Sequence, residues 1–174
     1  MAAPRNIRLL WHDDELDGPR SQYVAPWRKW FERLRPPITV TYTSTLAGFA
    51  AALSQEDEFQ LLVLDVMLKR ERDTNFRALG FERERILRLD AGAQIAGLLR
   101  NQVFARTRPE WLKRHSRTTL VLLTSTPTVA DLIQQYVDAD LRTGVHGIGK
   151  SHGDTVTQEF DAAMRVILKR LETG

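Results

Sequence analysis

The sequence predicts a doubly wound α/β domain, in which helices cover both faces of a five-stranded parallel sheet. Short apolar or β-branched runs alternate with longer segments of helical periodicity, which is the pattern of repeated strand–helix units. Polar residues with chemical capability also follow directly after four of the five runs. A length of 174 residues suits one domain, so we expect residues 1–174 to form a single domain.

Five segments have the composition of strands. The run at 7–11 is compact and apolar, and the run at 38–42 is rich in β-branched residues. The run at 59–66 is almost continuously apolar, which indicates a strand covered on both faces. The last two strands are expected at 118–123 and 144–148, the final one short and rich in glycine.

Helical periodicity separates these strands. In the first helical segment Trp27, Trp30 and Phe31 recur at helical spacing, so we expect them to face the core. Ser44 or Thr45 is expected to cap the second helix, since a side-chain oxygen at that position accepts a free backbone amide. The expected helices are 21–34, 46–53, 94–104, 129–137 and 156–171.

Right-handed crossovers between these units favour the flavodoxin-like strand order 2-1-3-4-5. Sheets of this kind bind their ligands at the carboxyl ends of the strands. The residues that follow each strand are therefore the candidates for a functional site.

One segment, at about 69–93, does not fit the repeat and is treated as an insert. A connection of this length is uncommon in a compact domain unless it is functional or locally structured. Residues 81–89 have some helical character, with Ile86 and Leu89 expected to pack inward. Because the insert follows the third strand, we expect it to cover the site or to form a surface for a partner.

The composition excludes several classes of protein. The net charge of +3 is small, and basic and acidic residues are interleaved in the insert, so direct binding of nucleic acid is not expected. No apolar run approaches the ~20 residues that span a bilayer, and no secretory signal is visible, so we expect a cytoplasmic protein without membrane contact. The absence of cysteine excludes thiol catalysis and thiolate metal sites.

The residues after the strands form a set that suits transfer of a phosphoryl group to a carboxylate. Several carboxylates together hold a hard cation such as Mg²⁺, one aspartate can attack phosphorus, and an ammonium and a hydroxyl can bind phosphoryl oxygens. Taken singly, an acidic run at a helix start, a threonine before a helix or a lone lysine is commonly structural. The residues concerned are Asp13, Asp14, Glu15, Asp65, Thr124, Ser125 and Lys150.

These segments together resemble the receiver domain of two-component response regulators. The run Trp11-His12-Asp13-Asp14-Glu15 resembles its acidic motif, and Leu61-Leu62-Val63-Leu64-Asp65 its phosphoacceptor strand. Leu122-Leu123-Thr124-Ser125 resembles its switch-hydroxyl strand, and Gly147-Ile148-Gly149-Lys150 its lysine strand. The resemblance covers essentially the whole chain outside the insert, in the correct order.

The resemblance implies a function and a site. Asp65 would accept the phosphoryl group from a histidine kinase or a histidine phosphotransfer protein, with Thr124 and Lys150 assisting. Asp13, Asp14 and Asp65 would hold Mg²⁺, with the backbone carbonyl of Met67 as a further ligand. Output would be through protein–protein contacts, including a possible homodimer, and the protein would not be an enzyme beyond its own phosphorylation and dephosphorylation.

The sequence departs from the family pattern in three places. The insert replaces the usual loop after the phosphoacceptor strand, and Ser151 stands where a proline usually follows the lysine. The aromatic residue that usually couples to the switch hydroxyl has no clear equivalent, since His146 or Gly147 occupies its place. A phosphorylation-independent pseudo-receiver therefore stays open as an alternative.

Two further readings carry less weight. A magnesium-dependent phosphohydrolase of the haloacid dehalogenase type needs a second aspartate two residues after the nucleophile, and that position is Met67. His146 and His152 flank Lys150, but their spacing does not match a zinc site.

Overall fold

The structure is a computed structural model of the chain, and it describes residues 6–34, 38–55, 58–69, 77–80, 88–100, 110–125, 128–150 and 156–173. Its centre is a parallel sheet of five strands in the order β2-β1-β3-β4-β5, which confirms the predicted topology. The strands are β1 (Ile7–His12), β2 (Ile38–Thr43), β3 (Leu61–Asp65), β4 (Thr119–Thr124) and β5 (Val145–Gly149).

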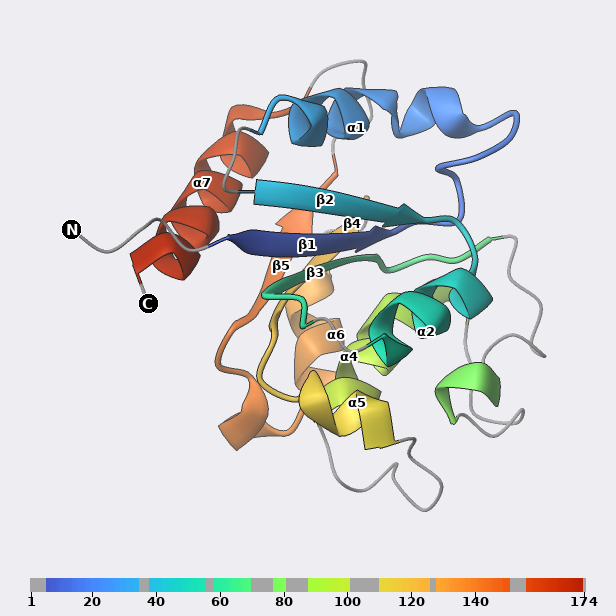
Figure 1. The fold of residues 1–174 in the computed structure, drawn as a ribbon, viewed down its shortest axis with the longest axis vertical. Coiled ribbons are helices and arrows are strands. Elements are labelled where there is room, and N and C mark those ends of the chain that lie inside the picture. Colours follow the sequence, from blue (N-terminus) through green and yellow to red (C-terminus); the bar gives the residue numbers. More distant parts are fainter. Residues whose placement is uncertain are drawn as a thin grey trace.

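Helices cover both faces of this sheet (Figure 1). On one face lie α1 (Ala25–Glu32) and α7 (Gln158–Thr173), and on the other lie α2 (Leu46–Ser54), α4 (Ala91–Arg100), α5 (Glu110–Arg114) and α6 (Val129–Tyr136). Single turns of 3₁₀ helix occur at Ser21–Tyr23, Arg77–Leu79, Arg88–Asp90 and Ala139–Leu141. The fold is therefore the doubly wound α/β arrangement that the sequence predicts.

Side chains that alternate between the two faces of the sheet divide the core into two layers. On β3, Leu62 and Leu64 pack with α2, α4 and α6, whereas Leu61 and Val63 pack with α1 and α7. Successive strand side chains point to opposite faces, so a continuous apolar strand serves both layers. This explains why β3 has no exposed residue.

The expected buried face of the first helical segment and the expected cap of α2 are confirmed. Trp27, Trp30 and Phe31 are buried against the sheet. Of the two caps expected for α2, Thr45 is the one observed, since its hydroxyl oxygen accepts a hydrogen bond from the amide of Gly48 at 3.1 Å. That bond satisfies one of the amides that a helix start leaves without a partner.

Two helix boundaries differ from the prediction. The segment expected as one helix at 21–34 is a 3₁₀ turn followed by α1, because Pro26 in the first turn of α1 has no amide to continue a ladder from the preceding turn. Helix α4 begins at Ala91 and not at 94, because its first turn contains only small residues and lacks the apolar signal on which the prediction depended. The part of the prediction beyond Arg100 lies outside the described residues.

A short helix was not predicted at all. Helix α5, Glu110–Arg114, has only five residues, too few to show helical periodicity. Its contribution to the core is Leu112, which is fully buried against α2 and β4 residues.

The insert is described only in part, and one expectation for it is wrong. Leu89 does not pack inward but is 64% exposed. It lies in the 3₁₀ turn Arg88–Asp90, where the neighbouring Asp90 accepts a hydrogen bond from the hydroxyl of Tyr136 on α6 at 3.0 Å. Leu79, in the described part of the insert, is buried and joins the core cluster that includes α2. Ile86 lies outside the described residues.

Within the described ranges, no helix combines the length and the apolar character that crossing a membrane requires.

Candidate functional site

The carboxyl ends of β1, β3 and β5 bring three predicted site residues to one edge of the sheet. Asp13 follows the last residue of β1, Asp65 is the last residue of β3, and Lys150 follows the last residue of β5. The strands are parallel, so these positions meet although up to 137 residues separate them along the chain. The sheet alone therefore explains why residues so distant in sequence share a site.

Lys150 bridges two of the carboxylates. Its Nζ lies 2.7 Å from Asp13 Oδ2 and 2.6 Å from Asp65 Oδ1. The exposed fractions of the three side chains are 11%, 0% and 9%, so this charged group is withdrawn from solvent. Charge-assisted hydrogen bonds of this length are strong where water does not compete for them.

Burial and neighbouring charges shift the pKa values of this group. Burial raises the pKa of Asp65 to about 7, against the lowering effect of the Lys150 ammonium and with a further rise from Asp13. For Lys150, burial by itself would lower the pKa, but the carboxylates of Asp65 and Asp13 raise it above its usual value. Lys150 therefore stays protonated, whereas the carboxyl group of Asp65 gains or loses its proton near neutral pH.

Asp14 completes a cluster that suits a metal ion. One carboxylate oxygen from each of Asp13, Asp14 and Asp65 lies within 4.8 Å of the others, and all three residues are buried. Hard oxygen donors gathered around a small space are the ligand set of Mg²⁺. The donor set thus fits the cation expected from the sequence, and it is the one such cluster among the described residues.

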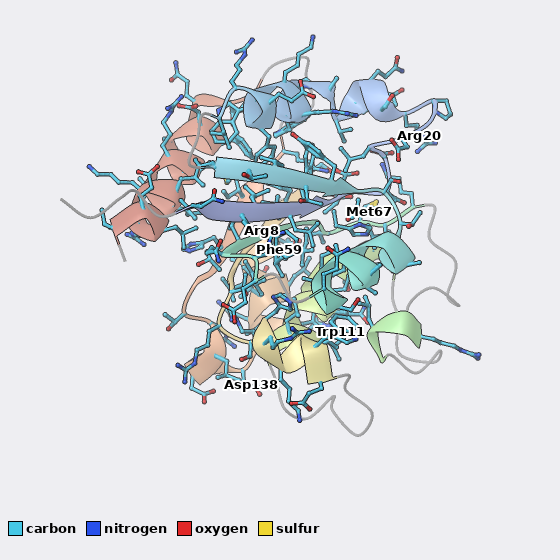
Figure 2. The ribbon with its side chains drawn as sticks, in the orientation of Figure 1. Arg8, Arg20, Phe59, Met67, Trp111 and Asp138 are labelled. Atoms are coloured by element: carbon cyan, nitrogen blue, oxygen red, sulfur yellow. The ribbon has the colours of Figure 1, made fainter. Side chains whose placement is uncertain are left out.

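The remaining predicted site residues lie at the same edge. Met67 follows β3 by two residues and is half-buried (Figure 2). Thr124 ends β4, is 3% exposed and lies in register with Gly149, and its carbonyl oxygen accepts a hydrogen bond from the amide of Lys150 at 2.5 Å. Their roles as metal ligand and switch hydroxyl stay predictions.

Glu15, one of the acidic residues expected at this edge, pairs with two cations that the sequence analysis did not connect with the site. Its amide donates to Asp13 Oδ1 at 2.9 Å, and its carboxylate Oε1 lies 3.4 Å from Arg20 and 3.5 Å from Lys69. Lys69 comes four residues after Asp65, and Arg20 comes from the loop between β1 and α1. Glu15 after β1 and Lys69 after β3 carry opposite charges, and that could have suggested an ion pair. The sequence does not fix the loop conformations on which such a pair depends.

Gly92 sets the distance between α4 and the site. Its amide donates to the carbonyl of Val66 at 3.1 Å, and a Cβ at this position would lie 2.3 Å from the backbone oxygen of Asp65. Only glycine permits this approach. The start of α4 therefore packs directly on the strand end that carries Asp65.

Gly147, one of the two residues considered for the place of the receiver aromatic, lies close to α6. Gly147 of β5 faces Val129 of α6, and a Cβ at residue 147 would lie 2.6 Å from Val129 Cγ1. A large side chain at this position is excluded while α6 holds its place.

The histidines do not add a metal site within the described residues. His12 is fully buried and its ring Nδ1 lies 3.0 Å from the carbonyl oxygen of Thr43, which accepts the hydrogen bond. Burial lowers the pKa of His12 to about 4, so the ring is neutral at physiological pH. His146 is half-buried on β5, and His152 and Ser151 lie outside the described residues.

Comparison with known proteins gives the fold and little more. No family model and no curated protein matches the chain. Among solved structures, a fusion carrying the trimeric coiled coil of yeast Spc42 aligns over 95% of this chain and 81% of its own, with a TM-score of 0.50 and 15% identity. The response regulator domain of Thermotoga maritima CheB aligns over 97% of this chain and 96% of its own, with a TM-score of 0.44 and 12% identity.

At 15% identity the first likeness indicates a shared fold and nothing about activity, and the second is too distant to support an argument. The observed sheet, with its order 2-1-3-4-5 and its buried acidic cluster, independently fits a receiver fold. The functional argument therefore depends on the site itself.

Proposed function

We propose that the protein is a response-regulator receiver that accepts a phosphoryl group on Asp65 from a histidine kinase or a histidine phosphotransfer protein. The observation that carries the proposal is the group of three buried aspartates, two of which Lys150 bridges at 2.6 and 2.7 Å. A nucleophilic carboxylate, further carboxylates for a cation and a fixed ammonium are the parts that this transfer requires.

The chemistry assigns a role to each side chain. An Oδ atom of Asp65 forms a bond to phosphorus while the bond from phosphorus to the donor's leaving nitrogen breaks, and that nitrogen keeps the electron pair. Lys150 leaves its contact with Asp65 Oδ1 and offsets charge on a phosphoryl oxygen. The hydroxyl of Thr124, at the end of the adjacent strand, donates to another phosphoryl oxygen.

A magnesium ion fits this account without altering it. Asp13, Asp14 and Asp65 would hold the ion with the carbonyl of Met67, and it would supply neutralisation of negative charge on the phosphoryl group. In the structure, Lys150 lies at close range to two of these carboxylates, those of Asp13 and Asp65.

The proposal includes a cytoplasmic location and output by protein contacts. Phosphorylation would alter the surface near the carboxyl edge of the sheet, where a signalling partner or a second copy of the chain would respond. The protein would catalyse only its own phosphorylation and dephosphorylation.

The contact of Gly147 with Val129 favours a second candidate, the phosphorylation-independent pseudo-receiver. With Val129 filling the space next to Gly147, an aromatic switch residue does not fit there, and in this candidate the fold serves only as an interaction module. The two candidates differ in one measurable property, which is modification of Asp65.

The test is incubation with acetyl phosphate and Mg²⁺, followed by intact-mass measurement. We expect wild type to gain one phosphoryl group, because Asp65 is the strand-end carboxylate within reach of Lys150. Asp65→Asn should gain none, and Asp131→Asn, which changes an exposed aspartate on α6, should behave as wild type. Failure of wild type to gain mass would favour the pseudo-receiver.

A further inference from the structure

A group of three charged residues, which we call the rim cluster, lies beside the buried carboxylates: Glu15, Arg20 and Lys69. Both cations approach the same atom, Glu15 Oε1, at 3.4 and 3.5 Å, near the long end of hydrogen-bonding distance. The side chain of Glu15 is 11% exposed, whereas those of Arg20 and Lys69 are 51% and 46% exposed. The carboxylate is thus largely buried and the two cations face solvent.

The rim cluster is joined to the acidic site through the backbone. The amide of Glu15 donates to Asp13 Oδ1 at 2.9 Å, and Lys69 follows Asp65 by four residues. Figure 2 labels Arg20 and Met67 at the carboxyl edge of the sheet, and Met67 is two residues before Lys69. The two cations therefore pair with a residue whose own backbone binds a carboxylate of the acidic site.

The charges explain what these cations could do there. Four carboxylates, those of Asp13, Asp14, Asp65 and Glu15, lie at this edge of the sheet, and Lys150 is already held between two of them. An approaching phosphoryl group is itself an anion, so the carboxylates repel it. Exposed cations beside the carboxylates reduce that repulsion and offer the phosphoryl group a first contact.

The geometry also leaves both cations free to change partner. Arg20 and Lys69 share one carboxylate oxygen at long distances, so neither has a strong bond to lose. A phosphoryl group offers several oxygens, which arginine binds through two parallel N–H groups and lysine as a point charge.

We propose that Arg20 and Lys69 bind the anionic phosphoryl group of the donor before transfer, and that Glu15 positions both cations beside the acidic site while no donor is present. This inference rests on the proposed function, since it assigns donor recognition to residues at the same site. The alternative is that the rim cluster merely ties the loop after β1 to the segment after β3.

The test compares wild type with Lys69→Met and Arg20→Met in the full chain. The rate of Asp65 phosphorylation is measured against acetyl phosphate concentration at saturating Mg²⁺. Each variant should raise the half-saturating donor concentration roughly 3- to 10-fold, as expected for loss of one partly exposed charge-assisted contact. The saturating rate should change less than about 2-fold, because neither residue takes part in the bond exchange.

A second readout separates recognition from mere structure. Binding of Mg²⁺ without donor, followed by tryptophan fluorescence, should be unchanged or up to about 3-fold tighter in both variants, because a nearby positive charge is removed. Lys113→Met is the matched control, since Lys113 is an exposed cation that pairs with Glu110 on α5. It should match wild type in both assays.

The possible outcomes are distinct. If wild type is phosphorylated and both rim variants keep its half-saturating donor concentration, the inference is wrong and the proposed function stands. If the variants lose Mg²⁺ affinity and saturating rate together, the rim cluster is structural and the inference is again wrong. If wild type is not phosphorylated at all, the proposed function itself fails, and the inference with it.

Discussion

Lys150 is the residue on which the stability of the acidic site depends. It is the close cation for both Asp13 and Asp65, and all three side chains are withdrawn from water. A buried charge that loses its partner is far more costly than an exposed one. The lysine therefore has a structural role in the free protein in addition to any role in phosphoryl transfer.

Replacing Lys150 by Met should lower the free energy of unfolding by about 3 kcal/mol above neutral pH, the usual cost of breaking a buried pair. The loss should shrink as the pH falls, because Asp65, whose pKa is about 7 in wild type and higher without the ammonium, then becomes protonated. Urea unfolding over a pH series measures both effects. Lys113→Met is the control, and equal stability of Lys150→Met and wild type above neutral pH would contradict this account.

His12 supplies a pH dependence of the opposite kind. Burial lowers its pKa from 6.5 to about 4, so the folded state binds a proton less readily than the unfolded chain. The stabilisation that depends on neutral His12 is fully present above pH 6.5 and is lost as the pH falls toward 4. Over that range the free energy of unfolding should decrease by about 3 kcal/mol on this account.

The measurement is the difference in unfolding free energy between wild type and His12→Gln over this range. Wild type should lose more stability on acidification than the variant, since glutamine does not titrate. His146→Gln, which changes a half-buried histidine, should keep most of the wild-type slope. Parallel curves for wild type and His12→Gln would show that His12 is not protonated on unfolding.

Among the elements, α6 packs closely on β5 at Gly147. A Cβ at Gly147 would lie 2.6 Å from Val129 Cγ1, whereas a Cβ at Gly149 meets nothing within 4 Å. The two glycines are two residues apart on β5 and so point to the same face. They form a matched pair, because an added methyl group would meet a neighbouring side chain at Gly147 and open space at Gly149.

Gly147→Ala should therefore destabilise the protein by about 1–3 kcal/mol, the usual cost of overpacking, while Gly149→Ala should cost less. Adding Val129→Ala to Gly147→Ala should restore part of the loss, because it removes the side chain that the new methyl group meets. Chemical denaturation of the four proteins gives the comparison. Equal effects of the two glycine changes would mean that α6 is not held against β5.

The sequence predicts elements well where the apolar pattern is long and less well where side chains are small. All five strands lie within two residues of their predicted limits, because continuous apolar runs such as 61–65 leave little choice. The start of α4 was missed since Ala91, Gly92 and Ala93 carry no apolar periodicity, although their small size is what lets α4 approach β3. Leu89 was assigned inward on periodicity alone, and a single 3₁₀ turn does not keep that period.

At the scale of the whole molecule, parallel topology makes the site predictable. Once the strand order is known, Asp13, Asp65 and Lys150 must share an edge, and the structure brings them within hydrogen-bonding distance. The rim cluster was not predictable in the same way. Glu15, Arg20 and Lys69 lie after the strand ends, where the sheet does not fix side-chain positions and loop conformation decides which charges meet.

The same topology places a sensitive reporter near the site. Trp11 on β1 is fully buried, packs on Phe31 with a ring-centroid distance of 5.0 Å, and lies two residues before Asp13. We therefore expect a change at the acidic cluster to alter the fluorescence of Trp11.

The measurement that tests the central claim most directly is titration with Mg²⁺ and beryllofluoride, an acyl-phosphate mimic, followed by tryptophan fluorescence. A working phosphoacceptor site predicts a saturable change that requires Mg²⁺ in wild type and is absent in Asp65→Asn, since the mimic bonds to the aspartate oxygen. If wild type gives no change, and NMR chemical shifts confirm that nothing binds, Asp65 is not a phosphoacceptor and the pseudo-receiver is the correct description.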